Sequence, residues 1–221
     1  MPQTLTRANL RTPKAAAIAG VLFAILLVVS FWMLRRSIPA DPLESGAWLA
    51  TDVRPVALAL NLIPFGGVAF LWFVAALRDR LGPLEDRFFA TVFLGSGLLF
   101  LAMLFTGAAI IGAMVMIAAA EPQALVNSAA FHLARAIAYN IMNVYAIKMA
   151  AVFMISSSTV ALYTGIAPRW IAYLGYVLAL VLLFGSYYIS WSFLVLPAWV
   201  LLMSSHILID NFRDARLLDR T

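Results

Sequence analysis

Residues 93–113 read FLGSGLLFLAMLFTGAAIIGA, and this stretch contains no charged side chain. A helix needs roughly 20 apolar residues to cross a hydrocarbon core about 30 Å thick. The stretch meets that requirement, and its glycines favour close packing against neighbouring helices. It therefore predicts a transmembrane helix, and we place the whole segment at about 88–118.

The composition of the chain also indicates a membrane protein. Hydrophobic residues make up 64% of the 221 residues and charged residues 11%, whereas soluble domains carry about 25% charged residues. Cysteine is absent, which excludes disulfides, iron–sulfur clusters and thiolate metal sites. The net charge of +5 comes from arginines in short loops without interleaved exposed aromatics, so we expect no nucleic-acid partner.

Six segments have the length and apolar character of membrane spans, at about 15–34, 55–77, 88–118, 138–163, 169–187 and 190–209. The last two are separated by GSYYISWSF (185–193), which we interpret as a tight turn at an interfacial aromatic belt. The first has a longer apolar run than a signal peptide and lacks a small-residue cleavage site, so we expect it to be retained. The prediction is an all-α, polytopic transmembrane helix bundle, a single domain over 1–221, in contact with the lipid bilayer.

Basic residues in the loops predict the orientation. With the N-terminus in the cytoplasm, ten arginines and lysines fall in inner segments and four in outer segments, while Lys148 lies within a span. The positive-inside rule then places both termini in the cytoplasm of a bacterial inner membrane. The pair Arg35–Arg36 opposes this orientation, because it follows the first span on the outer side.

The two outer connections, 35–54 and 119–137, are long enough for short helices. In the first, ADPLESGAW (40–48) places Asp41 at an N-cap position, Pro42 at N1 and Glu44 at N3. The second, EPQALVNSAAFHLARA (121–136), starts in the same way at Pro122. We predict that both form amphipathic helices lying on the outer surface.

The fourth span carries polar side chains on two sides. At 100° per residue, one stripe joins small and polar residues, and the opposite side also contains polar residues. The stripe consists of His132, Arg135, Tyr139, Asn143, Ala146, Ala150 and Ser157; Tyr145, Lys148 and Thr159 lie opposite, and Asn140 lies between. A helix of this kind cannot turn either side wholly to lipid, so we expect it inside the bundle or against a second subunit. Two interpretations remain open, a polar pathway and interhelical hydrogen bonding.

Lys148 is a charged residue in the middle of an apolar run, YNIMNVYAIKMAAVF (139–153). A lysine at the bilayer centre costs about 2.5–3.5 kcal/mol and usually pairs or faces water. Every carboxylate of the chain lies in a loop or at the end of a span. Lys148 therefore either extends to the outer interface, toward Asp52 or Glu121, or faces a hydrated cavity. The lack of a buried acid also argues against a proton relay.

The second span contains a possible interruption, NLIPFGGVAF (61–70). Pro64 removes a helix donor, and Gly66 and Gly67 loosen the following turn, so a kink is expected. Broken spans mark binding sites in some transporters, which makes Asn61 a candidate site residue. A plain kink without function is the alternative.

The sequence contains none of the common nucleophile, phosphate-binding, dinucleotide or metalloprotease motifs. His132 and His206 are predicted at opposite ends of the membrane, so they cannot hold one haem iron between them. We therefore expect no enzymatic activity, no metal and no cofactor.

Three stretches, RDRLGPLEDRFFATVFLGSGLLFLAMLF (78–105), MAAVFMISSSTVALYTGIAPRWIAYLGY (149–176) and WSFLVLPAWVLLMSSHILI (191–209), resemble small membrane proteins of GC-rich bacteria whose function is unknown. The resemblance implies a six-span bacterial protein and carries no catalytic residues. We predict channel- or transporter-like passage of an ion or small solute through or around the second and fourth spans, with a homo-oligomer as one arrangement. The alternative is an accessory or assembly subunit that docks to another membrane protein through the polar fourth span.

Overall fold

The computed structural model describes residues 12–51, 53–79, 87–120, 128–185 and 191–218, and every regular element within these ranges is helical. The elements are α2 (Thr12–Ser37), α3 (Trp48–Thr51), α4 (Val53–Asp79), α5 (Arg87–Ala120), α7 (Ala129–Asn140), the π-helical turn η2 (Ile141–Tyr145), α8 (Ala146–Thr164), α9 (Arg169–Gly185), the 3-10 turn η3 (Ser192–Leu194) and α10 (Val195–Leu218). The predicted all-α class is confirmed.

Among the described residues, five helical runs are long and apolar enough to cross a membrane, namely Ala15–Ser37, Val53–Arg78, Phe88–Ala120, Ala129–Thr164 and Ser192–Asp210. A sixth apolar helix, α9, has 17 described residues. At 1.5 Å per residue it spans about 26 Å, which is less than a hydrocarbon core of about 30 Å. The multi-pass character of the bundle therefore agrees with the prediction, and the number of full crossings remains a prediction.

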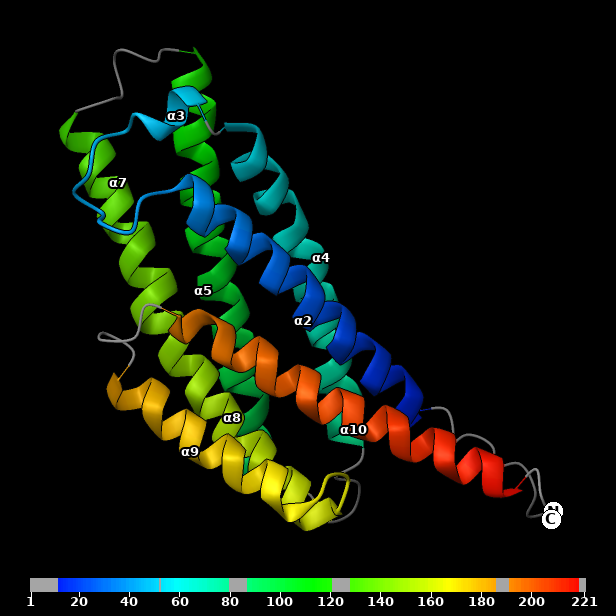
Figure 1. The fold of residues 1–221 in the computed structure, drawn as a ribbon. Helices are drawn as coiled ribbons and strands as arrows, with labels where there is room; N and C mark the ends of the chain where they lie inside the picture. Colours follow the sequence, from blue (N-terminus) through cyan, green and yellow to red (C-terminus); the bar gives the residue numbers. More distant parts are fainter. Residues whose placement is uncertain (1–11, 52, 80–86, 121–127, 186–190, 219–221) are drawn as a thin grey trace.

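The helices pack as two groups (Figure 1). In the first group, α2 lies along α4 and also packs against α10. In the second, α8 packs between α5 and α9, and α4 packs against α5 to join the groups. The end of the bundle that contains α3, the start of α4, the end of α5 and the start of α7 is here named the α3 end (Figure 1). α9 and α10 stop short of the α3 end, while α2 begins and α10 ends at the opposite end (Figure 1).

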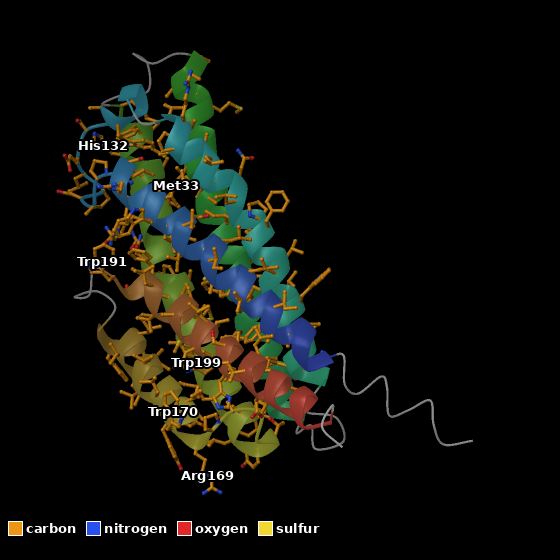
Figure 2. All side chains as sticks on the ribbon, turned by 45° about the vertical axis from the view of Figure 1, so that its right-hand side comes forward. Met33, His132, Arg169, Trp170, Trp191 and Trp199 are labelled. Atoms are coloured by element: carbon orange, nitrogen blue, oxygen red, sulfur yellow. The ribbon has the colours of Figure 1, made fainter. Side chains whose placement is uncertain are left out.

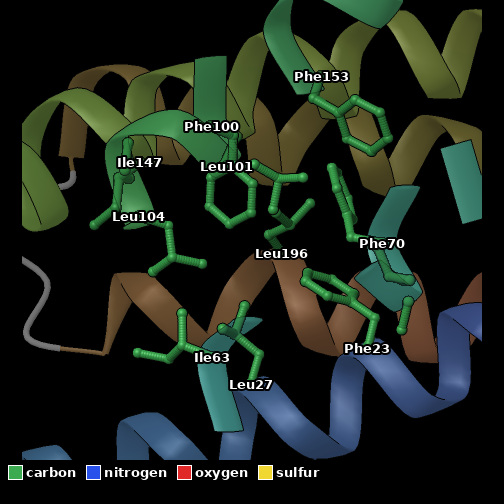
Figure 3. Packing of buried hydrophobic residues seen from close by; sticks show 14 of the residues in the cluster. Phe23, Leu27, Ile63, Phe70, Phe100, Leu101, Leu104, Ile147, Phe153 and Leu196 are labelled. Atoms are coloured by element: carbon green, nitrogen blue, oxygen red, sulfur yellow. The ribbon is translucent and has the colours of Figure 1, made fainter. Parts of the chain in front are cut away.

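Aromatic rings fill the centre of the bundle (Figure 3). The ring of Phe70 in α4 lies 4.7 Å from that of Phe23, 4.9 Å from that of Phe153 and 5.5 Å from that of Phe100, measured between centroids. All four side chains are buried, and the spacing is the one that aromatic pairs prefer. The cluster connects α2, α4, α5 and α8 and gives the middle of the bundle an apolar interior.

Gly175 allows α9 to approach both α8 and α10. A Cβ atom at this position would collide with Oγ of Ser158 and would lie 2.8 Å from Nε1 of Trp199. The indole Nε1 of Trp199 donates a hydrogen bond to the carbonyl oxygen of Ile171, at 3.3 Å. A side chain at position 175 would therefore separate three helices.

The connection between α2 and α4 differs from the prediction. Oδ1 of Asp41 accepts a hydrogen bond from the backbone N–H of Leu43 (2.8 Å), and the carbonyl of Asp41 accepts one from the N–H of Glu44 (3.3 Å). These bonds close a turn, and the chain becomes helical at Trp48. The predicted helix start at Asp41 is wrong. Gly46 follows closely in the sequence and has a low helix propensity, so the local capping pattern does not propagate into a helix.

The fourth helical run also begins differently. Oγ of Ser128 accepts a hydrogen bond from the N–H of Phe131 (3.1 Å) and caps α7. α7 then continues through η2 into α8 and packs against α5. The prediction of a separate surface helix before the fourth span is therefore wrong, because α7 has a protein partner for its apolar face. The predicted start at Pro122, the 80–86 loop and the 186–190 turn lie outside the described residues.

Candidate functional site

The π-helical turn η2 determines which side chains of the fourth helical run face inward. The N–H of Ala146 bonds to the carbonyl of Ile141, five residues earlier. A π turn accommodates one extra residue and so rotates the following helix by about 100° relative to a continuous α-helix. As a result Arg135 and Ala138 are buried on the same side as Ala146 and Ala150. Regular spacing predicted that His132 would occupy that side, but it is partly exposed.

A cavity of about 80 Å³ lies between α2 and the α7–η2 segment, close to the α3 end. A void of about 10–15 Å³ holds one water, so this space suits a small solute. Ile111 of α5 and Phe193 of η3 contribute apolar surface. Four of the described lining residues have polar side chains and none is acidic; these four are Arg35, Arg135, Tyr139 and Asn143.

Arg135 is the most buried charged group described in this region, with 6% of its surface exposed. Its Nη2 donates hydrogen bonds to the carbonyl oxygens of Pro39 and Asp41, the latter at 3.5 Å. Its guanidinium carbon lies 5.9 Å from the ring centroid of Trp48. Its Nε is buried without a hydrogen-bond partner among the described residues. Arg135 thus holds the 38–47 connection against α7 while one donor remains available.

Arg35 approaches the same cavity from the last turn of α2. Its guanidinium carbon lies 5.2 Å from the ring centroid of Phe193, within the range of a cation–π contact. The neighbouring Arg36 does not line the cavity and instead lies over Trp32, at 5.8 Å. The cavity therefore has positive charge on two walls, one contributed by α2 and the other by α7.

Tyr139 and Asn143 complete the polar wall on the α7–η2 side. Nδ2 of Asn143 donates to the carbonyl of Tyr139 at 3.1 Å, which fixes the amide on this wall. Together with Arg135, these two residues are the predicted site residues that the structure brings together. His132 lies nearby on α7, and its Nδ1 is buried without a partner among the described residues.

The other predicted site residues lie away from the cavity. Asn140, Tyr145 and Lys148 are exposed on the outer side of the run, and Nδ2 of Asn140 bonds to the carbonyl of Ala136 (3.0 Å). Asn61 is exposed on α4, where its Nδ2 bonds to the carbonyl of Ala57 (2.8 Å). α4 continues through Pro64 as one helix. The roles predicted for these residues remain predictions.

Lys148 lies near the middle of the fourth helical run, on its exposed side. Its neighbours Ile147 and Ala150 line a small pocket together with Ser192 of η3. Figure 2 shows Trp191, next to η3, part-way along the bundle between His132 and Arg169. Tryptophans gather at membrane interfaces, and the two interpretations of Lys148, extension to the interface and exposure to a hydrated cavity, remain predictions. Asp52 and Glu121, its predicted partners, lie outside the described residues.

Thr159, on the same predicted side as Lys148, has a structural role. Its Oγ1 lies 2.7 Å from the hydroxyl of Tyr176, so the two form a hydrogen bond between α8 and α9. Helix packing therefore explains Thr159, one of the polar residues that lie opposite the predicted stripe. It supports the interhelical interpretation on that side of the helix, while the cavity lies on the other side.

Sequence reasoning missed Arg35 and Phe193 as cavity residues. Arg35 was recognised only as a residue that opposes the predicted orientation. That departure from the positive-inside rule was the available signal, since a basic residue on the disfavoured side calls for a local reason. Phe193 carried no signal, because its place beside Arg35 depends on how η3 packs against α2.

The described residues contain no group of three or more His, Cys, Asp or Glu side chains that could hold a metal ion. His132 lies in α7 near the α3 end, and His206 lies in the second half of α10, which runs toward the opposite end (Figure 1). This separation agrees with the argument against a haem held between them.

No family model, no curated protein and no solved structure matches the chain. The function must therefore be argued from the site. The resemblance to bacterial membrane proteins remains a prediction.

Proposed function

We propose that this multi-pass membrane protein binds a small anionic solute in the cavity between α2 and α7, as the binding step of transporter-like passage. The observation that carries the proposal is the presence of Arg35 and Arg135 on one cavity whose described lining contains no acidic residue. An anion bound between the two guanidinium groups would be attracted by both of them. Guanidinium groups also present paired donors that match carboxylate and phosphate.

The hydrogen bonds of Arg135 support binding of an anion rather than a purely structural role. The carboxylate of Asp41 is engaged with the N–H of Leu43, and Asp41 meets Arg135 through its carbonyl oxygen. The guanidinium is thus held in position by neutral oxygens, and the nearby carboxylates of Glu44 and Asp41 attract its charge without a hydrogen bond to it. An anion in the cavity would add direct contact with the guanidinium, whose Nε has no hydrogen-bond partner among the described residues.

Transporter-like passage fits the surroundings better than an open channel does. Phe31, Met142 and Phe193 form the floor of the cavity, and the Phe70 cluster fills the bundle beyond them. A conducting pore needs a lining that replaces the hydration of its ion. Passage through this bundle would therefore require a rearrangement, and π turns such as η2 are frequent at functional sites. The α3 end, by the distribution of basic residues, is proposed to face outward from a bacterial inner membrane.

The accessory-subunit alternative is supported by a different observation. Lys148 and Tyr145 lie on the exposed side of the fourth helical run, facing away from the cavity. A charged side chain on that side suits an acidic residue of a second membrane protein. Co-purification from native membranes that is lost in Lys148→Met would favour this alternative.

Anion binding by the purified protein tests the proposal directly. We expect phosphate and acetate at millimolar concentration to raise the melting temperature in a nonionic detergent, because a ligand that binds the folded state stabilises it. Arg35→Gln and Arg135→Gln should each abolish the increase. Arg36→Gln is the matched control, since its guanidinium lies on Trp32 outside the cavity. Equal stabilisation of the wild type and both cavity variants would refute the proposal. Uptake of the stabilising anion by proteoliposomes then tests passage separately from binding.

A further inference from the structure

A second, smaller pocket lies next to the arginine cavity. It has a volume of about 20 Å³, and Ser192 contributes the one polar side chain among its described lining residues. Phe31, Met142 and Phe193 line both spaces. The site therefore changes from cationic to apolar across a partition of three side chains.

The cationic part of the site lies at the height of an aromatic girdle. Trp32 and Trp191 have about half of their surfaces exposed, at 50% and 53%, and their rings lie 6.1 Å apart. Tryptophan rings occupy this position at the level of lipid headgroups. Arg35 and Phe193 are close in sequence to these tryptophans, so the cavity and the girdle share one level. The apolar pocket then lies on the hydrocarbon side of the cavity, next to Leu196 of α10.

We propose that the anion is an amphiphile, with a carboxylate or phosphate headgroup between Arg35 and Arg135 and an alkyl chain directed past Phe31, Met142 and Phe193. This inference rests on the proposed function and adds the chemical class of the solute. A hydrophilic anion would use the arginines alone and gain nothing from the adjoining apolar surface. An amphiphile would contact both the arginines and the apolar pocket. Its headgroup and alkyl chain would then have the same orientation as those of a lipid in the leaflet.

Met142 is the side chain that makes room for the alkyl chain of the ligand. The pocket of about 20 Å³ admits little more than one methyl group, so a longer chain needs the partition to move. Methionine is unbranched and adapts its shape readily. Met142 also lies against Gly107 of α5, where any Cβ atom would collide with its Cγ. The absence of a side chain at Gly107 therefore gives Met142 space beside α5.

A chain-length series separates this inference from the proposed function. The purified full-length protein is titrated with acetate, butyrate, octanoate and decanoate, and with inorganic phosphate and decyl phosphate, with decyltrimethylammonium as the charge control. Two buried methylene groups give about a tenfold gain in affinity, so decanoate should bind at least tenfold more tightly than acetate. Arg135→Gln should weaken all the anions, and decyltrimethylammonium should show no dependence on Arg135.

Ala146→Leu tests the apolar half, because Ala146 is buried and lines the small pocket. The variant should keep acetate binding and lose the preference for decanoate. Retained acetate binding shows that the Ala146→Leu variant is folded. If the variant does not fold, the chain-length series on the wild type tests the amphiphile instead. Equal affinities for acetate and decanoate, both dependent on Arg135, overturn the amphiphile and leave the proposed anion site intact. Binding that is independent of both arginines overturns the two proposals together.

Headgroup chemistry of this kind occurs both in lipids and in free fatty acids. Nanodiscs that contain phosphatidylglycerol or phosphatidylcholine distinguish the two sources. Stabilisation by phosphatidylglycerol that Arg135→Gln removes assigns a lipid of the leaflet. Binding of decanoate without an effect of phosphatidylglycerol assigns a free acid. The inference fails if neither ligand shows a dependence on Arg135.

Discussion

Replacing Gly175 by alanine should destabilise the bundle, because the added Cβ would collide with Oγ of Ser158 and would lie 2.8 Å from Nε1 of Trp199. Overpacking of this kind costs about 1–3 kcal/mol. Displacing the indole of Trp199 also breaks its hydrogen bond to Ile171, worth about 1 kcal/mol. The expected steric loss is therefore about 2–4 kcal/mol.

Gly95→Ala is the matched control for this prediction. Gly95 is also inside a helix, and a Cβ there would meet nothing within 4 Å. Alanine raises helix propensity at both positions by about 0.8–1.0 kcal/mol, so that gain cancels in the comparison. The melting temperature of Gly175→Ala should fall below that of Gly95→Ala by roughly 4–16 °C, measured by tryptophan fluorescence in detergent. Equal melting temperatures would refute the close approach of α9 to α8 and α10.

Three further predictions concern the fourth helical run. Deleting Val144 should convert η2 into α-helix and rotate α7 by about 100° relative to α8. Arg135 should then leave the cavity, so anion binding should be lost while the helicity measured by circular dichroism is kept. Retained anion binding would contradict this role of η2. Lys148→Met should leave anion binding within about twofold and should not lower the melting temperature, since removing a membrane-embedded charge relieves its transfer cost; a large loss of binding would place Lys148 at the site. Thr159→Val and Tyr176→Phe should each lower stability by about 0.6 kcal/mol, and the double variant should be no worse than either single variant if their hydrogen bond is the cause.

The helical segments could be predicted closely because bilayer thickness constrains their length and composition. The predicted span at 88–118 corresponds to α5 over Arg87–Ala120, and the span at 15–34 to α2 over Thr12–Ser37. Both helices extend beyond the predicted spans, because a helix continues past the end of its apolar segment while its backbone hydrogen bonds are still formed. The predicted range at 169–187 corresponds to α9, whose described part ends at Gly185.

The site was predicted in part, for reasons that differ between residues. Arg135, Tyr139 and Asn143 share a face within one stretch of helix, so spacing alone grouped them. Arg35 joins them through the packing of α2 against α7, which no local pattern encodes. η2 escaped prediction because one extra residue in a helical turn leaves no mark in composition. The single angular scale applied to the whole run therefore placed His132 on the buried side.

The short length of α9 has a consequence for the surrounding bilayer. α9 spans about 26 Å, while α5 and the α7–α8 run are much longer, and Arg169 and Trp170 begin α9 as exposed anchoring residues. If the 17 described residues of α9 alone cross the bilayer, the lipids beside them should thin by about 4 Å, at a cost of a fraction of a kcal/mol per Å. Lipids beside α5 meet no such deficit. Such a crossing predicts an asymmetric lipid shell, thinner on the α9 side, where hydrophobic mismatch favours either a thinner membrane or contact with another subunit.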